Sequence, residues 1–211
     1  METAQIQKII ADQFADPGTA RDLQKLIRTV ATREHAQPSQ LDLAHGSSFI
    51  CNYLEQVPYL LVVAWTSARN VGLESEVHSI LEMVQSYWME DDDVIPDSLG
   101  IIGLLDDAYC SLLSMQTISD LYRMQSGKYL FPDNLTPANI IMRKIIGEPF
   151  ATDLDNIVRS AIDDACISES VKSLASPEKQ RLIDSQATIW NHGPVSEFPV
   201  SQLSGLGLTA D

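Results

Sequence analysis

Residues 48–71, SFICNYLEQVPYLLVVAWTSARNV, are apolar nearly all round when they are placed on a helix. A helix with apolar side chains on every face has to be buried among other helices. This stretch therefore predicts a central helix, which Gly72 ends. Pro58 lies inside it, and because proline removes a helical hydrogen bond we expect a kink or a break there.

On both sides of this stretch, apolar residues recur at helical spacing, and no segment shows the alternation of a strand. The sequence predicts an all-α protein, a single-domain bundle of about eight helices. The other expected helices cover approximately residues 6–14, 19–30, 77–88, 99–125, 136–146, 153–162 and 177–190. Residues 36–47 are expected to be a connecting loop.

The last twenty residues differ from the rest in composition, with Gly, Pro and Ser interspersed among single apolar residues. We expect one helical domain over residues 1–191 and an extended or partly disordered C-terminal arm over residues 192–211. Leu203, Leu206 and Leu208 can pack onto the same chain or onto a neighbouring subunit, which leaves a homo-oligomer open.

The chain is strongly acidic. Its 211 residues include 29 Asp and Glu against 14 Lys and Arg, a formal net charge of −15. Nucleic-acid binding needs clustered cations, so a nucleic-acid partner is disfavoured. Three widely spaced cysteines and an N-terminus without a secretory signal predict a cytoplasmic protein with reduced thiols. No apolar run reaches the roughly 20 residues of a spanning helix, so no membrane partner is expected.

Eleven acidic residues, and no Lys or Arg, lie within residues 71–121. A proline forces a turn between Asp93 and Asp97, and Asp106 and Asp107 follow on an apolar helix. If the turn folds back on that helix, these carboxylates meet, and oxygen ligands suit Mg²⁺, Ca²⁺ or Mn²⁺. The alternative is structural: Asp97 caps the following helix, and Asp106 and Asp107 lie near the positive end of that helix.

The segment Asp93-Val-Ile-Pro-Asp97, followed by Gly103 and Asp106-Asp107, resembles the signature of the YkvA-like family. These are small bacterial helical domains of unknown function, with an Asp-x-Ile-Pro-Asp turn before a Gly-x-x-Asp-Asp helix start. The resemblance covers about residues 75–125. It implies a helical hairpin that carries a paired-helix acidic site, and it implies no established reaction.

Two kinds of function fit these features. The first is a cytosolic YkvA-like protein whose acidic site binds a divalent cation, in a structural or a catalytic role; a catalytic ion would favour phosphate or diphosphate chemistry. The alternative is an acidic interaction protein, such as an inhibitor, an immunity-type protein or a pathway accessory protein, that binds a basic surface of a protein partner. The sequence has no Walker loop, dinucleotide fingerprint or nucleophile elbow, so no nucleotide or organic cofactor is indicated. No catalytic residue can be named, and whether the protein is an enzyme stays open.

Overall fold

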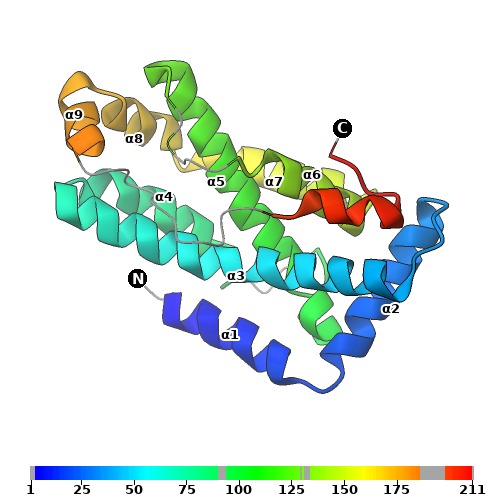
Figure 1. Cartoon of the computed structure of the whole chain (residues 1–211). Helices are drawn as coiled ribbons and strands as arrows, with labels where there is room; N and C mark the ends of the chain where they lie inside the picture. Colours follow the sequence, from blue (N-terminus) through cyan, green and yellow to red (C-terminus); the bar gives the residue numbers. More distant parts are fainter. Residues whose placement is uncertain (1–2, 90–93, 129, 131–133, 186–197, 211) are drawn as a thin grey trace.

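The computed structural model describes residues 3–89, 94–128, 130, 134–185 and 198–210. In this part of the chain it has nine α-helices, two 3-10 helices and no strand, so the all-α prediction is confirmed (Figure 1). The elements in chain order are α1 (Thr3–Ala15), α2 (Thr19–Arg33), α3 (Gln40–Val71), α4 (Glu74–Ser86), η1 (Asp97–Ile102), α5 (Leu105–Ser126), α6 (Thr136–Ile146), α7 (Phe150–Asp164), α8 (Ile167–Leu174), α9 (Pro177–Ser185) and η2 (Val200–Leu206).

The helix α3 is 32 residues long and begins well before the predicted start. Ser39 and Asp42 form a capping box: the Asp42 N–H donates to the Ser39 hydroxyl, and the Ser39 N–H donates to the Asp42 carboxylate at 2.8 Å. The predicted loop was therefore wrong over residues 40–47. Pro58 is buried, and α3 runs through it without a break.

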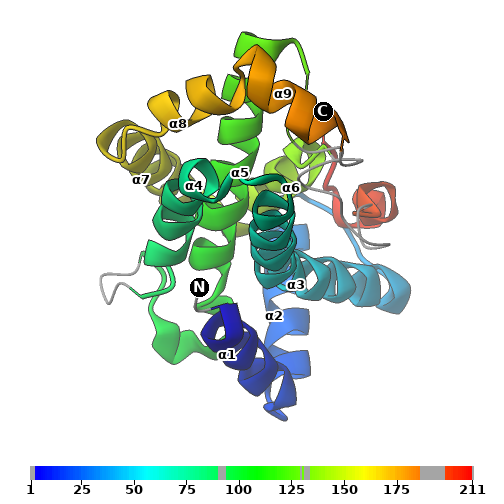
Figure 2. The ribbon, with the colours of Figure 1, turned by 90° about the vertical axis from the view of Figure 1, so that its left-hand side faces the viewer.

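The helix α5 lies in the middle of the bundle, against α3, α4, α6, α7 and α8 (Figure 2). Thirteen of its 22 residues are buried, and several of these are polar. Polar side chains in such a position need hydrogen-bond partners inside the protein. The indole N–H of Trp88, for example, donates to the Ser111 hydroxyl at 2.9 Å. Burial of α5 thus draws polar groups of the surrounding elements into the core.

The segment Ser98–Ser126, which contains α5, is long enough, and one 18-residue window within it apolar enough, for a membrane-spanning helix. It meets these criteria without a continuous apolar run of about 20 residues, because an average over the window tolerates Asp106 and Asp107. In the bundle, 72% of its most apolar window is buried by the rest of the protein. A helix buried at the core of a bundle can be apolar on every face, as a membrane-spanning helix is.

The pair α4 and α5 occupies the segment for which the sequence predicts a helical hairpin. The two helices pack against each other, and η1 lies between them along the chain. η1 in turn contacts α1 and α2, which ties the start of α5 to the N-terminal helices.

The described part of the C-terminal segment, residues 198–210, packs on its own chain rather than extending as an arm. Val200–Leu206 forms η2 against α3, and Leu203, Leu206 and Leu208 are buried. Gly46 on α3 permits the close approach, since a Cβ there would lie 2.9 Å from the Leu206 Cδ1. The apolar side chains of this segment are therefore part of the main core.

Truncation of Leu206 to alanine tests this packing. The side chain is 0% exposed, so Leu206→Ala should lower the free energy of unfolding by about 2–4 kcal/mol through lost burial and the remaining cavity. Urea unfolding at several protein concentrations measures the loss, which should not depend on concentration because the contact lies within one chain. Leu41→Ala, at a side chain 64% exposed, is the control and should change stability by less than about 0.5 kcal/mol. Equal effects of the two variants, or a loss that varies with concentration, would contradict the packing.

Candidate functional site

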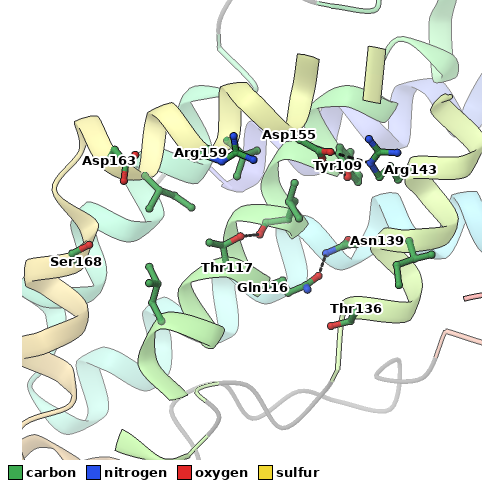
Figure 3. Close-up of a pocket in the computed structure, with 15 residues that line it drawn as sticks. Tyr109, Gln116, Thr117, Thr136, Asn139, Arg143, Asp155, Arg159, Asp163 and Ser168 are labelled. Atoms are coloured by element: carbon green, nitrogen blue, oxygen red, sulfur yellow. Dashed lines mark hydrogen bonds and ion pairs between the residues drawn. The ribbon is translucent and has the colours of Figure 1, made fainter. Parts of the chain in front are cut away.

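A pocket of about 450 Å³ opens between α5, α6, α7 and the start of α8 (Figure 3). This volume lies within the range of about 300–1,000 Å³ that is usual for small-molecule sites. Figure 3 shows Tyr109, Asp155 and Arg143 toward one end and Asp163 and Ser168 toward the other. The apolar part of the wall consists of Leu113, Leu121, Ile140, Val158 and Ile162.

Asp155 of α7 fixes one end of the pocket. Its Oδ1 accepts a hydrogen bond from the Tyr109 hydroxyl at 2.7 Å, and its Oδ2 accepts one from Arg143 Nε at 2.9 Å. Burial and the bond to this carboxylate raise the pKa of Tyr109, so the phenol stays protonated as a donor. The three side chains come from α5, α6 and α7, and Asp155 therefore holds the three helices together at this end.

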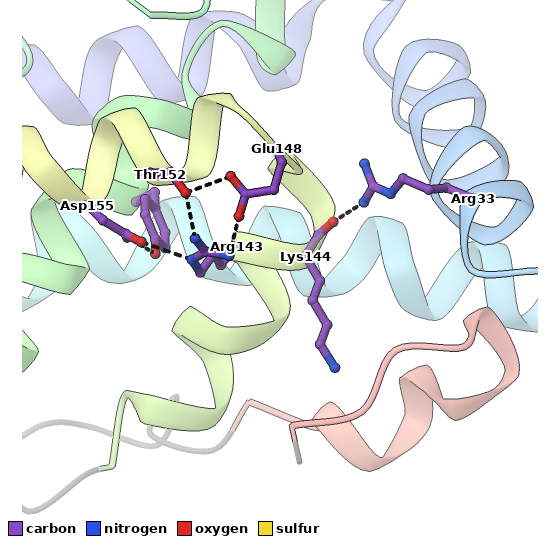
Figure 4. Close-up of polar contacts among 7 residues, drawn as sticks. Arg33, Arg143, Lys144, Glu148, Thr152 and Asp155 are labelled. Atoms are coloured by element: carbon purple, nitrogen blue, oxygen red, sulfur yellow. Dashed lines mark hydrogen bonds and ion pairs between the residues drawn. The ribbon is translucent and has the colours of Figure 1, made fainter.

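Arg143 extends this contact to the loop between α6 and α7 (Figure 4). It forms an ion pair with Glu148 at 2.8 Å and donates to the Thr152 hydroxyl at 3.1 Å. The Thr152 hydroxyl donates to Glu148, and this bond, together with Arg143, lowers the pKa of Glu148. Figure 4 also shows Arg33 of α2 donating to the Lys144 carbonyl. The end of α6 is thus anchored on both sides.

Asn139 of α6 joins three helices beneath the pocket. Its Nδ2 donates to the Leu112 carbonyl at 3.3 Å and to Gln116 Oε1 at 2.6 Å, both on α5. Its Oδ1 accepts from the Tyr53 hydroxyl of α3 at 2.6 Å. Burial raises the pKa of Tyr53, which keeps this phenol a donor. Because Asn139 is itself buried, these bonds are needed to satisfy its amide.

Two exposed charges of opposite sign, Arg159 and Asp163, lie on the α7 side of the pocket. The described lining contains no Cys, His or Lys, and its nucleophiles and acid–base groups are hydroxyls and carboxylates, such as those of Tyr109, Asp163 and Ser168. Fixed polar groups over an apolar wall are typical of sites that bind a molecule and orient it.

The structure places the predicted acidic residues as follows. Asp106 and Asp107 are buried in the first turn of α5, and Asp106 Oδ2 accepts a hydrogen bond from the Ile95 N–H at 2.9 Å. This bond ties the turn that precedes η1 to α5. Asp97 begins η1, but its side chain lies outside the described part of the chain, as does all of Asp93.

Within the described residues, no group of three or more His, Cys, Asp or Glu side chains lies close enough together to hold a metal ion. Of the four predicted ligands, only Asp106 and Asp107 have side chains in the described part of the chain. The divalent-cation site therefore stays a prediction.

The pocket itself was not predicted from the sequence. Its polar groups and the side chains that hold them lie far apart along the chain: Asn139 is 86 residues from its partner Tyr53, and Tyr109 is 46 residues from Asp155. One signal was present, because Asn139 occupies a position on the apolar face of α6, next to the buried Ala138.

Comparison with models of protein families, with curated proteins and with solved structures finds no match to this chain. The resemblance to the YkvA-like family stays a prediction.

Substitutions at Asp106 test its role in holding the turn. Asp106→Ala removes the acceptor of the Ile95 N–H and should lower the free energy of unfolding by about 1–3 kcal/mol. Asp106→Asn keeps an acceptor oxygen and should cost less. Urea unfolding measures both, with Asp120→Ala, at an exposed position of α5, as the control. If Asp106→Ala were as stable as the control, the bond would not hold the turn.

Proposed function

We propose that this protein binds a small, largely apolar molecule in the pocket between α5, α6 and α7. The observation that carries the proposal is the cavity of about 450 Å³ with apolar walls and a small number of fixed polar groups. Ligand pockets in proteins have this size, and in them apolar walls supply affinity while a few polar groups set the orientation of the ligand.

The fixed positions of the polar groups support the proposal. Asp155 is held by Tyr109 and Arg143, and Gln116 is held by Asn139, so these side chains have little freedom left to lose when a ligand enters. Binding to such a preorganised site costs less conformational entropy than binding to a mobile one.

A pair of matched substitutions tests this function. Ile140 is half-buried in the pocket wall, and Ile140→Trp should fill the cavity and abolish binding. Ile157 of α7 is 39% exposed and lies outside the lining, and Ile157→Trp is therefore the control. Calorimetric titration with a library of small apolar molecules should find ligands that saturate the unaltered chain and Ile157→Trp but not Ile140→Trp. A library without such a ligand, or ligands that bind all three proteins equally, would contradict the proposal.

A divalent-cation site at the start of α5 is the second candidate function. The observation that favours it is the burial of two adjacent carboxylates, Asp106 and Asp107, at the segment that resembles the YkvA-like signature. Carboxylate oxygens are the ligands that Mg²⁺, Ca²⁺ and Mn²⁺ prefer. Asp93 and Asp97 would complete the set. The acidic interaction protein also stays a prediction, which rests on the net charge of −15.

Thermal unfolding tests the cation site. After treatment with EDTA, addition of the ion at 100 times its dissociation constant should stabilise the protein by about 2.7 kcal/mol. For a chain of this size the unfolding temperature should rise by roughly 5–11 °C. Asp107→Asn should remove the shift, whereas Asp120→Asn, at an exposed position, should keep it. If none of the three ions shifted the unfolding temperature of metal-free protein, the cation site would be wrong.

A further inference from the structure

We infer that the ligand of the pocket between α5, α6 and α7 is an organic acid, whose carboxylate is recognised by the side-chain amide of Gln116 and the guanidinium of Arg159. This inference rests on the proposed function and adds the chemical class of the ligand. It follows from the direction of the hydrogen bonds beneath the pocket and from the charges on its wall.

The orientation of the Asn139 and Gln116 side-chain amides is set by the Leu112 carbonyl, which can only accept hydrogen bonds. The Leu112 carbonyl accepts from Asn139, so the NH₂ group of Asn139 lies on that side. The same NH₂ group donates to Gln116 at 2.6 Å, which requires Gln116 to present its oxygen there. The oxygen of Asn139 then faces the Tyr53 hydroxyl, which donates to it. The side-chain amides of Asn139 and Gln116 therefore each have one orientation that satisfies all of these hydrogen bonds.

The Gln116 NH₂ group is left as a donor at the pocket. Gln116 is half-buried and lines the cavity, and its Nε2 has no hydrogen-bond partner among the described residues. A hydrogen bond to a ligand acceptor contributes more binding free energy at a half-buried N–H than at a fully hydrated one, because less hydration is lost when the bond forms. The pocket therefore favours a molecule that brings an oxygen acceptor to this position.

Arg159 adds a positive charge from the α7 side. It donates to Asn156 through Nη1, whereas Nε and Nη2 have no partner in the part of the chain that the structure describes. The other arginine of the lining, Arg143, is already engaged by Asp155, Glu148 and Thr152. Arg159 is thus the cation that remains for a ligand, and guanidinium groups bind carboxylates with paired hydrogen bonds.

The remaining charges do not favour a cationic ligand at this position. Asp155 accepts hydrogen bonds on both of its oxygens, from Tyr109 and Arg143. Asp163 is exposed to solvent and lies one turn beyond Arg159 on α7, toward the end of the pocket at which Ser168 lies (Figure 3). An acid with an apolar body can thus place its carboxylate between α5 and α7 and its hydrocarbon part against Val158 and Ile162.

Matched ligands distinguish the acid from other polar groups on the same body. Octanoate, octanamide and octylamine form one set, and phenylbutyrate, phenylbutanamide and phenylbutylamine form another. Calorimetric titration of the full chain at neutral pH should show each acid binding at least about tenfold more tightly than its amide and its amine, because bonds between charged groups are the stronger ones.

Two substitutions locate the recognition. Arg159→Gln should reduce the preference for the acid to about threefold or less, and Gln116→Glu, which puts a negative charge of the same shape in place of the amide, should abolish it. Arg28→Gln removes one exposed arginine on α2, outside the pocket, and should leave the preference unchanged.

The outcomes separate this inference from the proposed function. Acid, amide and amine binding with equal affinity, and all lost in Ile140→Trp, would leave the pocket as the binding site and overturn the assignment of an acid. A preference for the acid that Arg159→Gln and Arg28→Gln reduce alike would overturn the role of Arg159. Binding of none of the six molecules would overturn the inference, and the library titration would then decide separately whether the pocket binds at all.

Discussion

Burial of most of α5, above all its first three turns, is the constraint on which the rest of the structure depends. The buried polar side chains of a helix surrounded by five others cannot reach water, so they need partners inside the protein. Tyr109 finds one on α7, Ser111 on the segment after α4, and Asp106 on the turn before η1. These bonds fix the order in which neighbouring helices surround α5, which apolar contacts alone specify less sharply.

The pocket is a consequence of the same constraint. Where α6 and α7 meet α5, the polar contacts of Asn139 and Asp155 hold the helices at fixed positions, and the apolar side chains between these contacts do not fill the space. The cavity therefore has a wall made of core side chains and an edge made of oriented amides and charges. Such an arrangement recognises a ligand by the hydrogen-bond acceptors of the ligand as well as by the shape of the ligand.

The sequence predicted the class of the fold and most of its helices, because apolar periodicity is a local property. It missed the start of α3, where Ser39 and Asp42 form a capping box with aspartate in place of the more usual glutamate or glutamine. It also missed the pocket, because Tyr53, Gln116 and Asn139 are brought together only by the packing of three helices. The clustered acidic residues predict a cation site, and in the structure one of them, Asp106, accepts a hydrogen bond from a backbone N–H.

The most direct test of ligand binding in the pocket between α5, α6 and α7 is an NMR titration of the ¹⁵N- and ¹³C-labelled chain with octanoate. We expect saturable shifts of the Gln116 side-chain NH₂ resonances, assigned by their loss in Gln116→Glu, together with shifts of the Val158 and Ile140 methyl groups. The Val62 methyl groups, on the exposed face of α3, should not move. Saturable shifts confined to other surfaces, with the Gln116 and Val158 resonances unchanged, would contradict binding in this pocket.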